Sequence, residues 1–154
     1  TQDSSSSCVG ITGGNSVESD TGTNLSLSYQ NGDPCFTGTV ASSGWGSVYI
    51  LELASSGNWN ATTAGVTGFS FASRGANPPA SLNVYYKDPD GTDYCRTIAP
   101  GETAVPFADA HPNCSTNAAS ATVDPTQMDE LILAFLPRSP AYTVNFCLQI
   151  TALD

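Results

Sequence analysis

Positive charge is scarce in this sequence of 154 residues, which has four Lys and Arg residues against fourteen Asp and Glu. The formal net charge of −10 provides no basic surface for a phosphate backbone or for anionic lipid headgroups. Long apolar runs are also missing, since none approaches the roughly 20 residues that cross a bilayer. We therefore expect neither nucleic acid nor a membrane as a partner.

Histidine is almost absent, and any mechanism built on imidazole must use His111, which precedes Pro112 and is expected to be a solvated loop residue. Oxidative polysaccharide cleavage by copper needs an amino-terminal histidine, but the chain begins with Thr1. The segment Gly68–Ala72 imitates the G-x-S-x-G turn of esterases, yet it lies in a strand-like alternation with no helix pattern after it. The copper-dependent class is therefore excluded, the esterase motif lacks its structural context, and a structural role is the expected one for His111.

Cysteine spacing excludes two further kinds of site, because no C-x-x-C pair occurs and the five cysteines are too far apart for a zinc knuckle. Disulfides are the better interpretation, and we predict that Cys95 pairs with Cys114. In the chain-entropy model, a disulfide that closes a loop of about 20 residues stabilises the folded state by roughly 3 kcal/mol. The pairing of Cys8, Cys35 and Cys147 stays open, since an odd count leaves one cysteine over.

Small polar residues dominate what is present, and charged residues make up only 12% of the sequence. Extracellular proteins often have such a hydroxyl- and amide-rich surface, so the composition predicts a secreted protein. The polar start Thr1–Ser7 has no apolar signal-peptide core, which implies that any signal peptide has already been removed. The length fits one domain, 1–154, with a single core.

Apolar segments bounded by Gly, Pro, Asn and Asp recur along nearly the whole chain, as is typical of short strands joined by tight turns. They predict about nine strands and a closing one, near Ser7–Ile11, Leu25–Tyr29, Cys35–Val40, Val48–Leu53, Gly65–Ser73, Ala80–Lys87, Thr92–Ile98, Thr103–Pro106, Glu130–Leu136 and Ala141–Ala152. Asp88–Gly91 predicts a hairpin turn, since it places Pro and Gly where a tight turn needs them. Helical periodicity occurs only around Pro125–Leu133, where Asp124 could cap a short helix or 3₁₀ turn.

The predicted fold class is all-β, a two-sheet antiparallel β-sandwich of the jelly-roll type, with a closed barrel as the alternative. Alternation places one set of side chains in the core, namely Leu82, Val84, Tyr86, Val144, Phe146, Leu148 and Ile150. The residues between them, including Asn83, Tyr85, Asn145 and Gln149, then point outward.

Several short motifs, in order along residues 35–153, resemble those of galactose-binding-like jelly-roll domains in secreted bacterial proteins. They are Ser43–Gly46, Gly68–Gly75, Tyr94–Arg96 followed by Val105–Phe107 and Asn113–Cys114, and the closing Asn145–Cys147. The resemblance implies a non-catalytic β-sandwich of the carbohydrate-binding-module type, often with one structural calcium.

No cofactor is expected to be required, but oxygen ligands for a hard cation are abundant. Asp88, Asp90 and Asp93 imitate part of a calcium loop, although the hairpin explains the same residues more simply. A calcium elsewhere could draw on Glu18, Asp20 or Asp154.

Sugar recognition needs aromatic faces beside amides, carboxylates or Arg that hydrogen-bond hydroxyl groups. We predict one concave ligand-binding face formed by Asn83, Tyr85, Tyr94, Arg96, Asn145 and Gln149, with Trp59 as an exposed ring in a polar loop. The alternative for Tyr85 and Tyr94 is ordinary cross-strand packing, and for Trp59 it is core packing. Trp45 is expected to be a wedge in the sandwich edge and Arg74 to brace a carboxylate within the fold.

The leading hypothesis is a carbohydrate-binding module that keeps a secreted enzyme or cell-surface protein near an extracellular polysaccharide. One alternative is a structural or adhesive module. The other is a small glycosidase that uses a carboxylate pair, for which the sequence offers Glu52, Asp93, Glu102, Asp109, Asp129 and Glu130. The sequence does not identify the glycan, and it is compatible with further domains in a parent protein.

Overall fold

Ten strands and three short helical turns make up the computed structural model, which describes residues 11–154. The strands are β1 (Asn15–Ser19), β2 (Asn24–Gln30), β3 (Asp33–Val40), β4 (Ser47–Glu52), β5 (Gly68–Asn77), β6 (Leu82–Lys87), β7 (Asp93–Ile98), β8 (Glu102–Pro106), β9 (Glu130–Phe135) and β10 (Tyr142–Leu153). The helical turns are α1 (Ala61–Ala64), η2 (Phe107–Asp109) and η3 (Pro112–Cys114). None of these helices in residues 11–154 is long and apolar enough to cross a membrane.

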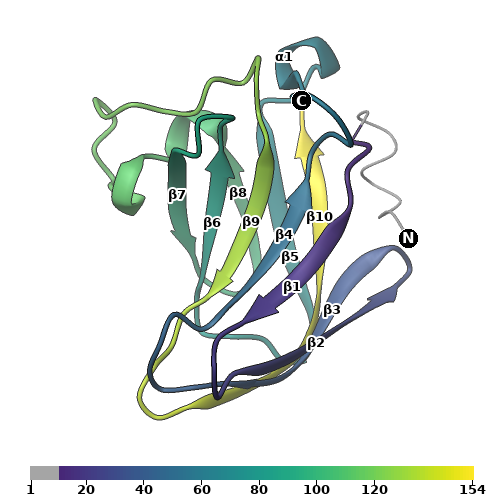
Figure 1. Cartoon of the computed structure of the whole chain (residues 1–154), viewed down its shortest axis with the longest axis vertical. Helices are drawn as coiled ribbons and strands as arrows, with labels where there is room; N and C mark the ends of the chain where they lie inside the picture. The colour runs from purple at the N-terminus through teal and green to yellow at the C-terminus, as the bar shows by residue number, and fades with distance from the viewer. Residues whose placement is uncertain (1–10) are drawn as a thin grey trace.

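The strands form two antiparallel five-stranded sheets that pack face to face (Figure 1). Sheet A has the order β1-β4-β9-β6-β7, and sheet B has the order β2-β3-β10-β5-β8. Strands that are distant in sequence lie side by side in both sheets, as a jelly roll requires. The predicted all-β sandwich is therefore confirmed, and the closed-barrel alternative is wrong.

The core lies between the sheets and follows the predicted alternation. On β6, Val84 and Tyr86 are 0% exposed, and on β10 the four predicted residues from Val144 to Ile150 are at most 3% exposed. The ring of Phe36 sits at the centre of one aromatic cluster, with centroids 5.4 Å from Tyr49 and 5.5 Å from Phe146. Burial of such side chains supplies most of the stability of the sandwich.

Local turn chemistry explains the hairpin between β6 and β7. The Gly91 N–H donates to the Asp88 carbonyl at 3.0 Å, and Gly91 has φ +87, which favours glycine. The Asp88 N–H donates to the Thr92 carbonyl at 3.1 Å. The hairpin predicted from Asp88–Gly91 is confirmed.

Four local elements differ from the predictions or lie outside the described residues. Where a short helix or 3₁₀ turn was predicted at Pro125–Leu133, the chain forms one turn, in which the Gln127 N–H donates to the Asp124 carbonyl at 3.2 Å, and then enters β9, which pairs with both β4 and β6 in the middle of sheet A. Strand β1 was not predicted, since Val17 is its only apolar side chain. Helix α1 was also missed, although Asn60 caps it by accepting from the Thr63 N–H at 2.9 Å. Except for Ile11, the predicted strand Ser7–Ile11 lies outside the described residues.

Two disulfides cross-link the sandwich. The predicted bond between Cys95 and Cys114 is confirmed and ties β7 to η3. The second bond joins Cys35 to Cys147, which are paired residues of β3 and β10 in sheet B. Cys8 lies outside the described residues.

Candidate functional site

The two sheets divide the residues that were predicted to share one binding face. Asn83 and Tyr85 lie on β6 in sheet A, whereas Asn145 and Gln149 lie on β10 in sheet B. Since each pair points away from the shared core, the two pairs lie on opposite sides of the sandwich. The prediction of a single face made from both pairs is wrong, because sheet membership depends on non-local pairing.

The register of β6 against β7 separates the predicted residues further. Tyr94 is paired with Tyr86 and Arg96 with Val84, so both point to the core side of sheet A and away from the side of Tyr85. Tyr94 is partly buried against the core, whereas Arg96 is exposed on the edge strand. Neither the shared face nor the alternative of Tyr85 packing on Tyr94 is correct.

The side-chain amide of Asn83 is hydrogen-bonded within sheet A. Its Nδ2 lies 3.3 Å from the Tyr85 hydroxyl, and its Oδ1 accepts from the Thr97 hydroxyl at 2.7 Å. The residue is only 7% exposed. Asn83 therefore stabilises the sheet surface and offers little to a ligand.

The burial of the two tryptophans is the reverse of what was predicted. Trp59 is 5% exposed and stacks near Phe69, with ring centroids 6.0 Å apart, so its predicted exposure is wrong. Backbone hydrogen bonds of 2.9 Å in both directions join Trp59 to Met128 and draw the end of the polar loop into the core. Trp45, predicted to be a wedge, is instead 49% exposed.

His111 is a structural residue, but it is not solvated as expected, since it is 3% exposed. Its backbone pairs with Cys95 in both directions, at 2.9 and 3.1 Å, and so extends sheet A beyond β7. Its Nδ1 lies 3.2 Å from the carbonyl oxygen of Ala121. This packing, rather than catalysis, accounts for the position of the imidazole.

A groove of about 370 Å³ crosses the outer face of sheet B and is lined by Gln30, Arg74, Gly75, Ala76, Asn145, Phe146 and Cys147. We call it the sheet B groove. It lies at a β-bulge, where the register between β5 and β10 shifts between Asn145 and Cys147. Gly75 in this bulge has φ +121, and a Cβ there would lie 2.9 Å from the Phe146 Cα. The absent side chain thus lets the two strands approach and keeps the floor of the groove open.

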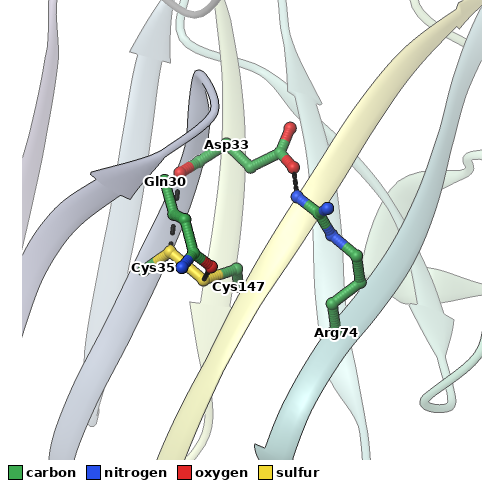
Figure 2. Close-up of a disulfide and its surroundings, with 5 residues drawn as sticks. All are labelled: Gln30, Asp33, Cys35, Arg74 and Cys147. Carbon is green, nitrogen blue, oxygen red and sulfur yellow. Dashed lines mark hydrogen bonds and ion pairs between the residues drawn. A yellow bond between two sulfur atoms is a disulfide. The ribbon is translucent and has the colours of Figure 1, made fainter.

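An ion pair spans the groove's central strand. Asp33 on β3 and Arg74 on β5 lie on either side of β10, and their side chains meet across it (Figure 2). The Asp33 side chain is 10% exposed, whereas that of Arg74 is 47% exposed. The prediction that Arg74 braces a carboxylate is confirmed, and the guanidinium also presents a rigid set of donors to the groove.

Two amides complete the polar wall of the sheet B groove. Gln30 lies against the Cys35–Cys147 disulfide, with its Oε1 3.7 Å from the Cys147 Sγ (Figure 2). This is a packing contact, because a disulfide sulfur carries no hydrogen to donate. Asn145 is exposed on β10. Each amide can donate and accept at once, which suits hydroxyl groups.

The surface around the sheet B groove is also rich in hydroxyl and amide groups. Exposed side chains on the outer face of sheet B are mostly hydroxyls and amides, namely Asn24, Ser26, Ser28, Thr37, Thr143, Gln149 and Thr151. Within the described part of sheet B, no strand places an aromatic ring on this outer face. Gln30 and Gly75 were not singled out from the sequence, since only the bulge and the neighbouring strands give them their place in the groove.

Among residues 11–154, no three His, Cys, Asp or Glu side chains gather around one point. At the hairpin, one oxygen each of Asp88 and Asp90 accepts from the Thr92 N–H, at 3.0 and 2.9 Å. Hydrogen bonds from Thr92, the hydroxyl first, lower the pKa of Asp90. The carboxylates thus support the turn, and calcium binding stays a prediction.

No carboxylate is among the residues that line the sheet B groove. Glu130 and Glu52 are paired across β9 and β4, but Glu130 is held by Lys87, whose Nζ lies 3.2 Å from its Oε2. This hydrogen bond raises the pKa of Lys87. Neither of these two carboxylates lines the sheet B groove.

Comparison with known proteins gives relatives in structure only, since no family model and no curated protein matches the chain. The family 11 carbohydrate-binding module from Clostridium thermocellum, solved with a β-1,3-1,4-mixed-linked tetrasaccharide, has a TM-score of 0.58 at 16% identity, over 91% of this chain and 90% of its own. A family 30 carbohydrate-binding module has a TM-score of 0.53 at 16% identity, over 100% and 86%.

An agarase also contains this fold, with a TM-score of 0.60 at 12% identity over 91% of this chain and 24% of the agarase. At such identities the likeness concerns the fold alone. The chain has the jelly-roll sandwich fold of carbohydrate-binding modules of families 11 and 30, as its galactose-binding-like motifs predicted.

Proposed function

We propose that this chain is a non-catalytic carbohydrate-binding module that holds an extracellular polysaccharide or oligosaccharide in the sheet B groove. The observation that carries the proposal is the groove itself, where Gln30, Arg74 and Asn145 surround a cavity of about 370 Å³ on a rigid sheet. Amides and a guanidinium bind hydroxyl groups without the large desolvation cost of unpaired charges. The hydroxyl-rich surface around the groove extends the area that a sugar chain could contact.

Structural relatives support the same proposal. One of them was solved with a bound tetrasaccharide, and another is an agarase in which the matching region is only 24% of the chain. By analogy, we propose that this domain targets a secreted enzyme or cell-surface protein to its glycan. Two disulfides support an extracellular location, because such bonds persist in oxidising compartments.

Binding rather than hydrolysis is proposed because the sheet B groove has no acidic side chain in its wall. A glycosidase needs two carboxyl groups about 5–10 Å apart on either side of the bond that it cleaves. Release of reducing sugar should therefore stay at background with any polysaccharide that the domain binds.

The test is affinity electrophoresis through gels that contain plant, algal and microbial polysaccharides, including mixed-linked β-1,3-1,4-glucan and agarose. At least one of them should retard the wild-type domain. The double variant Gln30→Ala/Asn145→Ala removes two hydrogen-bonding amides, each worth about 1 kcal/mol, so its affinity should fall about thirtyfold. Asn58→Ala, which removes an exposed amide from the loop after β4, is the matched control and should bind as the wild type does.

Three results would count against the proposal. Retardation by none of the polysaccharides would favour a structural or adhesive module. Equal affinities of the wild type and the double variant would place the binding site outside the sheet B groove. Hydrolysis that is abolished by a single Asp or Glu substitution would show that the domain is a glycosidase.

A further inference from the structure

Trp45 is the only large apolar side chain that is exposed among residues 11–154, with 49% of its surface accessible. Single exposed apolar residues are common and need no function to explain them. The loop that carries Trp45, however, is held in one conformation by contacts on both sides of the residue.

Asp20 fixes the loop on the side that precedes Trp45. Its Oδ2 accepts from the Trp45 N–H at 2.8 Å, and its Oδ1 accepts from the Thr21 N–H at 2.7 Å. Gly44 has φ +86, and a Cβ at this position would lie 1.9 Å from the Asp20 Oδ2. The carboxylate therefore occupies the space that any side chain at position 44 would need.

Gly46 fixes the loop on the other side. It has φ +84, and a Cβ there would lie 2.0 Å from the carbonyl oxygen of Phe135. Its own carbonyl accepts from the Asp20 N–H at 2.8 Å. Two glycines thus flank the indole and provide no neighbouring side chain to cover it, while the backbone is held in place. A ring that is already positioned loses less conformational entropy when it binds a ligand.

The surroundings of Trp45 indicate what kind of ligand it contacts. The exposed residues next to it along the two loops are hydroxyl residues and glycines, namely Thr21, Gly22, Ser42, Ser43 and Gly44. A stable protein interface buries about 800 Å² on each partner and has an apolar centre made by several side chains. One aromatic ring among hydroxyl groups is too small for such a centre, but it matches the size and the mixed polarity of a single sugar ring.

We infer that Trp45 is a stacking platform for one sugar ring, at the loop end of the sandwich and separate from the sheet B groove, with which it shares no residue. The C–H face of the sugar would lie on the indole, and the neighbouring hydroxyl side chains would bind its hydroxyl groups. The ligand class rests on the proposed function, but the site does not.

Tryptophan fluorescence gives a direct readout, because the second tryptophan, Trp59, is 5% exposed. The probe is whichever of mixed-linked β-1,3-1,4-glucan, agarose and the other gel polysaccharides retards the wild-type domain. Its addition should shift the emission of Trp45 to shorter wavelength and protect it from acrylamide quenching. In Trp45→Phe, where only buried Trp59 emits, neither change should occur.

Affinity supplies the second readout. Trp45→Ala should weaken binding at least tenfold, and Trp45→Phe, which keeps a smaller ring, should lie between Trp45→Ala and the wild type. Both variants should melt within about 2 °C of the wild type, since the indole contributes little to the core. The groove variant Gln30→Ala/Asn145→Ala should keep the fluorescence response at saturating polysaccharide.

Each alternative outcome overturns a defined statement. If the wild type binds but Trp45→Ala binds equally and the emission does not change, the stacking site is refuted while the proposed function stands. If the wild type sediments as a dimer that Trp45→Ala converts to a monomer, the occupant is a second copy of the chain. If no polysaccharide binds, the proposed function is refuted, and with it the assignment of a sugar as the ligand of Trp45.

Discussion

Removing the Cys35–Cys147 disulfide should destabilise the domain more than removing Cys95–Cys114. The two bonds close loops of very different length, with sequence separations of 112 and 19 residues. In the chain-entropy model, closing these loops lowers the entropy of the unfolded chain by amounts worth about 4.8 and about 3.3 kcal/mol. The expected difference is therefore about 1.5 kcal/mol.

Local packing should change this difference little. Cys35 is 8% exposed and Cys95 is 3% exposed, so replacement by Ala removes one buried sulfur from each site. The two bonds differ mainly in what they do to the unfolded chain. This makes the pair of double variants a matched comparison of loop length.

The free energy of unfolding is measured by urea titration of Cys35→Ala/Cys147→Ala and Cys95→Ala/Cys114→Ala. Both variants, and their reference, carry Cys8→Ser, so that each protein contains an even number of cysteines. The emission of buried Trp59 reports the transition. An equal loss from both double variants, or a larger loss from Cys95→Ala/Cys114→Ala, would refute the argument from loop length and show that native-state contacts dominate.

Two further predictions concern single positions. Gly46→Ala should destabilise the domain well beyond Gly57→Ala, because both residues have positive φ but only the Cβ at position 46 meets a backbone atom, the Phe135 oxygen at 2.0 Å. For Gly57→Ala, urea titration should show a loss of about 1–2 kcal/mol in the free energy of unfolding, which comes from the left-handed backbone alone. An equal loss in Gly46→Ala would show that the contact with the Phe135 oxygen has no effect. Hydrogen bonds from Thr126 lower the pKa of Asp124. The ionised carboxylate therefore stabilises the folded protein above the ordinary Asp pKa of about 3.9, and this stabilisation is lost as the pH falls through the lowered pKa. Stability should thus fall less steeply below pH 4 in Asp124→Asn, and an NMR titration should find the wild-type pKa below its usual range.

Local sequence was enough to predict features that depend on neighbouring residues. The turn at Asp88–Gly91 followed from the φ preferences of Pro and Gly, and nine of the predicted strand ranges correspond to strands in the structure. The core set that includes Val84 and Phe146 followed from alternation along single strands. The same logic failed at Pro125–Leu133, because the pairing of β9 with β4 and β6 overrode a weak helical pattern.

The candidate site depended on contacts that no single segment contains. The sheet B groove needs the bulge opposite Asn145 and the ion pair between Asp33 and Arg74, and these join strands that are distant in sequence. Local alternation could assign Asn83 and Asn145 to outer faces, but it could not show that these faces lie on opposite sheets.

The amino-acid sequence by itself determined the kind of fold and the alternating core, because these follow from composition and short-range periodicity. Only the tertiary structure decided which tryptophan meets solvent. Trp59 is buried because Met128 pairs with it from about seventy residues away, and Trp45 is exposed because Asp20 holds its loop. Solvent exposure is a property of the assembled surface, and it therefore depends on partners that the neighbouring sequence does not reveal.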